Sequence, residues 1–179
     1  MCIRDSDWTM GISNTLRYRN LSLSFLIDVR YGGVMYSGTV SDLRVNGMAE
    51  ETIGKNRTDI VDKGVKQDGT ENTTAITPYQ FWSNNYSSKV SEANVFDATF
   101  VKLREMVLSY QMPQRWFKNC FIGSLALGVE GRNLWLMKSN VPHIDPETNI
   151  FGPSAVGSGV EYSAIPTTRS WGFNIKLTF

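Results

Sequence analysis

The sequence predicts an all-β fold built from antiparallel strands. Apolar and polar residues alternate over about five stretches, and strict alternation places each set on its own face of a strand. Each stretch has roughly the 9–11 residues that a tilted strand needs to cross a bilayer. The links between the stretches run short, long, short, long, so the long loops gather on one side, as in outer-membrane barrels. We therefore expect the antiparallel strands of a large transmembrane β-barrel, with long extracellular loops.

Composition narrows the classes of function. The net charge of the 179 residues is +1, so nothing favours nucleic acid as a partner. No apolar run approaches the roughly 18 residues of a membrane-spanning helix. Cys2 and Cys120 suggest no disulfide framework, and His143, the single histidine, lacks the companions of a zinc site. We expect no metal and no cofactor.

The first six residues are not expected to belong to the fold. Met1–Ser6 lacks the apolar segment of a secretory signal. It resembles a short translated tag found at the front of truncated metagenomic reading frames. We interpret residues 1–6 as a non-native leader and residues 7–179 as the natural sequence, the C-terminal part of a barrel whose earlier strands are missing.

Two alternating runs open the natural sequence. Asp7–Arg19 and Leu21–Gly32 are joined by the turn residue Asn20, which predicts a hairpin. The apolar face of the second run carries no charge, because Asp28 and Arg30 both lie opposite it. An arginine facing lipid near the midplane would cost about 2–4 kcal/mol, so this segregation favours a lipid-facing side.

A long polar segment follows, from Gly33 to about Asp97. Such a length without regular structure is unusual in a compact soluble domain and is typical of an extracellular barrel loop. Within it, Val45–Ile53 and the stretch around Tyr79–Tyr86 are the candidates for a helical turn. Aromatic side chains here either contact substrate or a lid, or pack the loop on itself, and we favour packing. The candidate contacts are Tyr79, Trp82 and Tyr86.

The next two strands are predicted at Thr99–Met112 and Gly123–Met137. Charges fall on both faces in the upper part of the first, which indicates a bulge or a rise above the bilayer. Pro113 ends that strand because it has no N–H to donate. On the second, Glu130 and Arg132 share the polar face, where they pair either with each other or with charges on adjacent strands, and we favour this structural role over acid–base chemistry.

A second long loop, Ser139–Thr168, precedes the last strand. Asp145 and Glu147 lie in it, but their pattern is not that of an EF-hand, and we favour a solvated loop over a calcium site. The final stretch, Arg169–Phe179, alternates strictly and ends the sequence on an aromatic residue. Its apolar face consists of Trp171, Phe173, Ile175, Leu177 and Phe179.

Four ordered segments carry a resemblance to a known family. They are DATFVKLREMVLSYQMP (Asp97–Pro113), GRNLWLM (Gly131–Met137), NVPHIDPETN (Asn140–Asn149) and IPTTRSWGFNIKLTF (Ile165–Phe179). Together they resemble the C-terminus of SusC/RagA-type TonB-linked outer-membrane transporters. The resemblance runs from about Asp7 to the end, apart from the variable long loop.

The resemblance implies an active importer of oligosaccharides or peptides in the bacterial outer membrane. Its barrel would have about 22 strands and a plugged lumen. Energy would come through TonB, which contacts the missing N-terminal part, and a SusD-like surface lipoprotein would form a lid. The barrel-assembly machinery would read the apolar face of the last strand, Phe179 included. The residues expected to line the polar lumen are Arg17, Asp28, Arg30, Glu130 and Arg132.

Two other readings compete with active import. A soluble extracellular carbohydrate-binding β-sandwich would use the loop aromatics as a sugar platform. A passive porin-like barrel would lack a plug and TonB dependence, and only the family resemblance separates it from an active transporter. No nucleophile–base pair, phosphate loop or metal cluster appears in the sequence, so we expect no catalytic residues and no enzyme.

Overall fold

The computed structural model describes residues 6–53, 59–87, 90–117, 121–150 and 159–179, without the side chains of residues 85–87. Cys2 and Cys120 lie outside the described residues, as does most of the leader expected at residues 1–6. The chain divides into two compact units. The sheet unit comprises Ser6–Gly32, Thr99–Asn140 and Thr167–Phe179. The loop unit comprises Gly33–Ala98 and Val141–Pro166.

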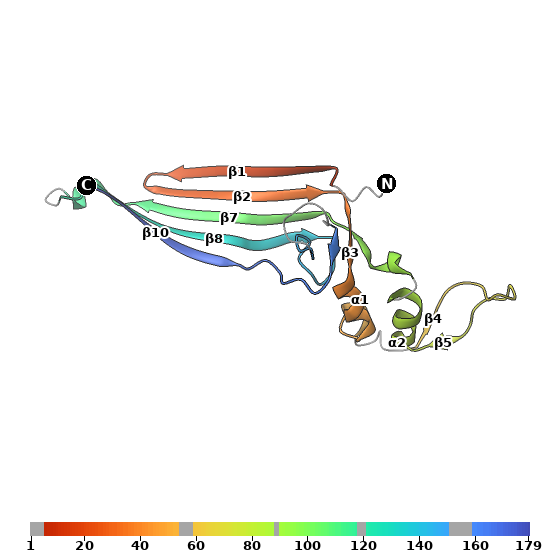
Figure 1. Cartoon of the computed structure of the whole chain (residues 1–179). Coiled ribbons are helices and arrows are strands. Elements are labelled where there is room, and N and C mark those ends of the chain that lie inside the picture. The colour runs from red at the N-terminus through yellow and green to blue at the C-terminus, as the bar shows by residue number, and fades with distance from the viewer. Residues whose placement is uncertain (1–5, 54–58, 88–89, 118–120, 151–158) are drawn as a thin grey trace. The chain divides into compact units, whose positions relative to one another are not determined.

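Five antiparallel strands form the sheet unit (Figure 1). They lie side by side in chain order, so each long strand pairs with the next one along the sequence. The strands are β1 (Trp8–Tyr18), β2 (Leu21–Tyr31), β7 (Phe100–Gln111), β8 (Ser124–Ser139) and β10 (Ser170–Thr178). All five expected strands are confirmed, and the hairpin at Asn20 joins β1 to β2.

The register keeps the alternation in phase across the whole sheet. Leu23 of β2 lies opposite Leu16 of β1 and Leu108 of β7. Leu108 in turn lies opposite Val129, which lies opposite Phe173. Because directly opposed residues share a face, the apolar sets of the five strands combine into one continuous face. We call this the apolar face, and the opposite side the polar face.

The strand pairing is irregular in one half of β7 and β8. We call this half, which continues into the long loops, the upper half of the sheet, and the half near the β1–β2 turn the lower half. Ile27 and Leu26 pair with Leu103 and Glu105, so Arg104 is an extra residue in β7. The pairing of β7 with β8 shifts over the same stretch. The mixed charges in this part of the strand are therefore explained by a bulge. Beyond the bulge, each residue of β7 points to the opposite face from the one that simple alternation predicts.

The loop unit contains more regular structure than expected. Strand β3 (Val34–Ser37) pairs with β6 (Val95–Asp97) and, in parallel, with β9 (Val160–Glu161). A second small sheet pairs β4 (Ile60–Val61) with β5 (Ala75–Ile76). The helices are α1 (Gly38–Val45), α2 (Pro78–Gln80), which continues as the π-helix η3 (Phe81–Ser87), and the 3-10 turns η1 (Glu50–Thr52) and η4 (Ser91–Asn94). A further 3-10 turn, η5 (Gln114–Trp116), belongs to the sheet unit.

Both expected helical turns are confirmed, by η1 within Val45–Ile53 and by α2 and η3 over Tyr79–Tyr86. Helix α1 is an additional helix that the sequence analysis did not predict. Ser37 caps α1 by accepting a hydrogen bond from the backbone N–H of Val40 at 3.1 Å. An N-cap serine satisfies an otherwise unpaired N–H, and here it starts a helix rich in weak helix formers.

A small core and a buried carboxylate hold the loop unit together. Met35, Ala98 and Val141 are each 3% exposed, and Phe96 and Ile144 pack against them. Glu161 is fully buried, and its carboxylate accepts hydrogen bonds from the hydroxyls of Ser37 and Thr39, both at 2.6 Å. The two segments of the loop unit are thereby joined.

The described helices are all short. None of them is both long and apolar enough to cross a bilayer.

Candidate functional site: the two faces of the sheet

The five residues expected to line a lumen share one face of the sheet. Gly11 lies opposite Asp28 and Arg17 lies opposite Ser22, which places these side chains on the polar face. Arg30 lies two residues from Asp28 on β2 and so shares its face. Pairing through β7 places Glu130 and Arg132 on the same face. The members are Arg17, Asp28, Arg30, Glu130 and Arg132. Their orientation toward a lumen stays a prediction.

Arg104 is the charged residue that links the upper part of the polar face, and sequence reasoning missed it. Its guanidinium donates to Asp28 Oδ2 at 2.5 Å and to Asn133 Oδ1 at 3.3 Å. It therefore joins β2 to β8 across β7. Simple alternation assigns Arg104 to the opposite face from Asp28, and only the bulge brings the two together. Charges on both faces were the one signal in the sequence.

The other charged side chains on the upper polar face differ in whether they have local partners. Lys102 is only 3% exposed, and its ammonium donates to Thr167 Oγ1 at 3.0 Å. Glu130 and Arg132 approach to 4.0 Å, the long limit of an ion pair. Nε of Arg30 is buried and makes no hydrogen bond within the described part of the chain. The upper polar face thus interleaves positive and negative groups.

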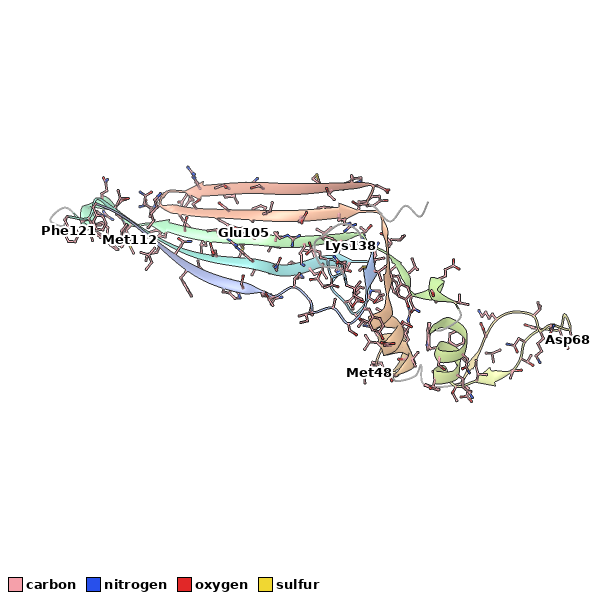
Figure 2. All side chains as sticks on the ribbon, viewed as in Figure 1. Met48, Asp68, Glu105, Met112, Phe121 and Lys138 are labelled. Carbon is pink, nitrogen blue, oxygen red and sulfur yellow. The ribbon has the colours of Figure 1, made fainter. Side chains whose placement is uncertain are left out.

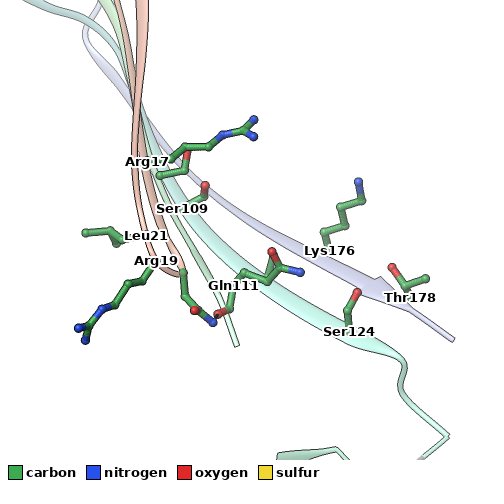
Figure 3. Close-up of a pocket in the computed structure, with 11 residues that line it drawn as sticks. Arg17, Arg19, Leu21, Ser109, Gln111, Ser124, Lys176 and Thr178 are labelled. Atoms are coloured by element: carbon green, nitrogen blue, oxygen red, sulfur yellow. Dashed lines mark hydrogen bonds between the residues drawn. The ribbon is translucent and has the colours of Figure 1, made fainter. Parts of the chain in front are cut away.

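The lower part of the polar face, near the β1–β2 turn, forms a concave pocket of about 560 Å³. Its charged groups are Arg17, Arg19 and Lys176. Figure 3 shows Arg17 and Lys176 projecting from the same side of the sheet, whereas Arg19 points away from that side. The remaining lining is small or neutral: Asn20, Leu21, Ser22, Ser109, Gln111, Ser124, Ala126 and Thr178.

The apolar face is open and carries stacked aromatic pairs at both ends. Trp8 and Tyr31 stack at 5.5 Å at one end, and Phe121 and Phe179 stack at 5.7 Å at the other. Figure 2 places Phe121 beyond the end of the strands, in the link between β7 and β8. Amphipathic aromatic rings are enriched where a membrane protein meets the bilayer interface.

The last strand carries the residues predicted to form the assembly signal. Their side chains are exposed on the apolar face, at 83% for Phe173 and 78% for Phe179. Trp171 lies opposite Gly131, where an added Cβ would come within 3.0 Å of the indole ring. Glycine thus makes room for the ring. The role of this strand in assembly stays a prediction, for Trp171, Phe173, Ile175, Leu177 and Phe179 alike.

In the loop unit, Arg44 is the centre of a polar and aromatic cluster. Its guanidinium binds Glu51 Oε1 at 2.5 Å and the backbone oxygen of Ala93 at 2.6 Å. It also lies over the rings of Trp82, at 4.5 Å, and Phe96, at 5.3 Å. Such cation–π contacts add to the ion pair. The cluster ties α1 to the segments around η1, η3 and β6.

His143 extends this cluster to the second segment of the loop unit. Its Nε2 lies 3.3 Å from Glu51 Oε2. Burial opposes ionisation of Glu51, but hydrogen bonds from Arg44 and His143 and the charge of Arg44 hold the pKa of this carboxyl below its ordinary value. Glu51 therefore stays ionised and bridges the two loop segments.

Of the two aromatic candidates for substrate or lid contact whose side chains are described, Tyr79 is the more open. Tyr79 is 63% exposed, whereas Trp82 packs on Arg44 and on Phe81, whose ring lies edge-on at 5.1 Å. The side chain of Tyr86 lies outside the described residues. Packing of the loop on itself thus describes Trp82, and contact with substrate stays a prediction.

The described residues contain no cluster of three potential metal ligands. Asp145, considered for calcium, instead accepts a hydrogen bond from the backbone N–H of Glu147 at 3.2 Å. This closes a local turn in the loop.

Comparison with known proteins finds relatives among TonB-dependent receptors. No protein-family model matches the chain. Two relatives from Formosa agariphila, TonB-dependent receptor P3 and TonB-dependent receptor P26, are 25% and 26% identical over 97% of the chain. The chain spans only 16% and 17% of the length of these relatives.

Solved structures with a similar fold belong to large β-barrel transporters. Two are the RagAB peptide importer in its "open-open" state (TM-score 0.60, 18% identity) and the RagAB peptide transporter (TM-score 0.62, 20% identity). The matches cover 96% and 98% of the chain and 17% of each solved chain. The described sheet accordingly has the fold of a set of antiparallel strands from a large barrel. The predicted likeness to SusC/RagA-type TonB-dependent receptors is thus confirmed in both sequence and fold, and the chain corresponds to about one sixth of such a receptor.

Proposed function

We propose that this chain forms part of the wall of an outer-membrane importer. The observation that supports the proposal is the separation of the sheet into a continuous apolar face and a charged face. Leu16, Leu23 and Leu108 share the first, and Asp28 and Arg104 are paired on the second. A sheet with lipid on one side and a polar interior on the other requires this separation.

The soluble β-sandwich is the weaker alternative. A sandwich buries one face of each sheet against the other, so the large apolar side chains would be covered. Here Phe173 is 83% and Ile175 is 67% exposed. An apolar groove of about 510 Å³ also runs over Leu108, Leu127 and Val129 on the same face. Lipid acyl chains suit such a surface.

We propose that import is active and depends on TonB. The relatives named TonB-dependent receptors support this choice over a passive porin. The cargo would be oligosaccharides or peptides, and the similarity to a peptide importer favours peptides. A SusD-like lipoprotein would act at the extracellular side with the loop unit, where Tyr79 is exposed. We propose no enzymatic activity.

Uptake by cells that carry the full-length receptor gene tests this function. We expect the receptor in the outer-membrane fraction and uptake of labelled peptides or oligosaccharides that stops when the tonB gene is deleted. Deletion of the SusD-like gene should lower uptake of dilute cargo most strongly. Uptake that persists without TonB would support the passive porin, and a receptor in the soluble fraction would support the sandwich.

A further inference from the structure

Arg19 is a cation at the lower border of the apolar face. It lies in the turn between β1 and β2, with a positive φ of 53°, and so does not follow the alternation of the strands. Figure 3 shows its side chain on the same side of the sheet as Leu21, a residue of the apolar groove. Its guanidinium lies over the ring of Tyr18, with Cζ 5.4 Å from the ring centroid. A guanidinium that stacks by its face keeps the N–H groups at its edge available to an anion.

The apolar groove of about 510 Å³ continues from this border across the sheet. Its side chains form two rows across the strands, which the register fixes. They are Leu21, Tyr110, Leu127 and Ile175 in the lower row, and Leu108, Val129 and Phe173 in the row above. Leu21 also lies opposite Tyr18, so the lower row leads directly to the ring under Arg19.

Strand β8 forms the floor of the groove. Leu127 and Val129 are less exposed, at 37% and 38%, than the neighbouring Ile175 and Phe173 of β10. Because β8 has a paired strand on each side, this floor does not depend on the edges of the sheet. The two rows span roughly 7 Å along the strand direction. The groove therefore suits the first part of an acyl chain that runs along the strand.

The lower end of the sheet has the composition of a membrane interface. Its links are the short ones, which face the periplasm in outer-membrane barrels. The side chains of Tyr18 and Tyr110 lie in the lower row, and Trp116, which is 63% exposed, follows β7 in the link. Tyrosine and tryptophan are enriched at the level of the lipid headgroups. This position places Arg19 among phosphate groups and not in hydrocarbon, where a charge is costly.

We propose that Arg19 and the groove over β8 form one binding site for a glycerophospholipid. The phosphate group accepts hydrogen bonds from the guanidinium of Arg19, and one acyl chain lies in the groove over Leu127 and Val129. The turn is two to three strand spacings from β8, roughly 10–14 Å, which a phosphate and an acyl chain joined through glycerol can span. This inference rests on the proposed function, because it takes the apolar face as the lipid side. It adds one specific lipid, its orientation and its two contacts.

Native mass spectrometry of the full-length receptor in detergent tests the headgroup contact, with dioleoyl phosphatidylglycerol as the probe. We expect one molecule to bind the wild type before any others. Arg19→Gln should weaken this binding about fivefold, the effect of one cation near a phosphate surface. Arg17→Gln is the matched control and should leave the affinity unchanged, because Arg17 projects from the opposite side of the sheet (Figure 3). Dioleoylglycerol, which lacks the phosphate, should bind the wild type and Arg19→Gln equally weakly.

A second pair of variants tests the groove. Val129→Phe places a larger side chain in the floor and should weaken binding of the probe about tenfold, the effect of withdrawing one or two methylene groups from an apolar contact. Ile12→Phe adds bulk to the apolar face on β1, outside the groove, and should leave the affinity unchanged. The heat-dependent shift on gels shows that both variants form the folded barrel.

The outcomes separate this inference from the proposed function. An unchanged affinity in Arg19→Gln, or equal affinities for phosphatidylglycerol and dioleoylglycerol, overturns the headgroup contact and with it the site. An unchanged affinity in Val129→Phe overturns the groove contact in the same way. These results in a receptor that still fractionates with the outer membrane keep the barrel wall. A receptor that folds in the soluble fraction without detergent overturns the barrel wall itself.

Discussion

Phe179, the last residue of the sequence, stacks on Phe121 with ring centroids 5.7 Å apart and planes 6° from parallel. The backbone N–H of Gly123 donates to the oxygen of Thr178 at 2.7 Å beside this pair. Phe121 belongs to the link between β7 and β8, so the end of the last strand is anchored to the neighbouring hairpin. The aromatic residue predicted from the terminal pattern therefore has a defined partner.

This stack predicts separate effects for the two rings. Phe121→Leu should remove an aromatic pair worth about 0.5–1.5 kcal/mol but leave the terminal strand intact. Phe179→Asp should lower the yield of assembled barrel much more, because it also removes the predicted assembly signal. Yield is measured by the heat-dependent shift of folded barrel on gels. Equal yields for Phe179→Asp and wild type would contradict the assembly role.

The Arg104–Asp28 pair predicts a coupling across β7. In a double-mutant cycle, Arg104→Gln and Asp28→Asn should show a coupling free energy of about 1 kcal/mol, since both side chains are only about one third exposed (29% and 32%). Urea unfolding of the full-length receptor in detergent micelles measures it. The control cycle uses Glu130→Gln and Arg132→Gln, whose 4.0 Å separation predicts a smaller coupling. The reverse order would refute the bulge geometry.

The Glu51 bridge predicts that the loop unit loosens in acid. The pKa of Glu51 is lowered by folding, so its contribution to stability is complete above its ordinary value of 4.5 and is lost as the pH falls through the folded value. Hydrogen exchange at α1 and η1 should therefore accelerate below about pH 4.5. The Glu51→Gln variant should exchange fast at all pH values. An unchanged pH profile in that variant would show that another group is responsible.

Gly38 predicts a steric effect at the start of α1. A Cβ added there would lie 2.0 Å from the ring of Tyr162, so Gly38→Ala must displace the ring. Overpacking of this kind costs about 1–3 kcal/mol. Gly64→Ala is the control, because no atom lies within 4 Å of its added Cβ. In limited proteolysis, the loop unit of the Gly38→Ala variant should be cut faster than that of the wild type, and the Gly64→Ala variant should be cut at the wild-type rate. Equal rates for Gly38→Ala and the wild type would contradict the close packing of Gly38 against Tyr162.

The sheet could be predicted because alternation, turn residues and strand length are local properties of the sequence. Leu21–Tyr31 shows each of these, and its register with β1 follows from the short turn. The polar face followed from the same pattern, which is why Asp28 and Glu130 were found.

The parts that sequence reasoning missed depend on contacts between distant residues or on a bulge that shifts which face the side chains point to. Arg104 reaches Asp28 only through a bulge, and no local rule gives the position of its extra residue. Helix α1 contains Gly38, Thr39 and Val40, which are poor helix formers, and it is held by Ser37 and the distant Glu161. The cluster around Arg44 likewise joins segments far apart in the sequence.

The most direct measurement of the central claim compares an arginine on each face of one strand. Phe25 is on the apolar face near the middle of β2, and the adjacent Ser24 is on the polar face. In the full-length receptor, Phe25→Arg should destabilise the folded barrel by about 2–4 kcal/mol, whereas Ser24→Arg should be nearly neutral. Unfolding in lipid vesicles gives both values. Equal costs at the two positions would contradict a sheet with lipid on one side and a polar interior on the other.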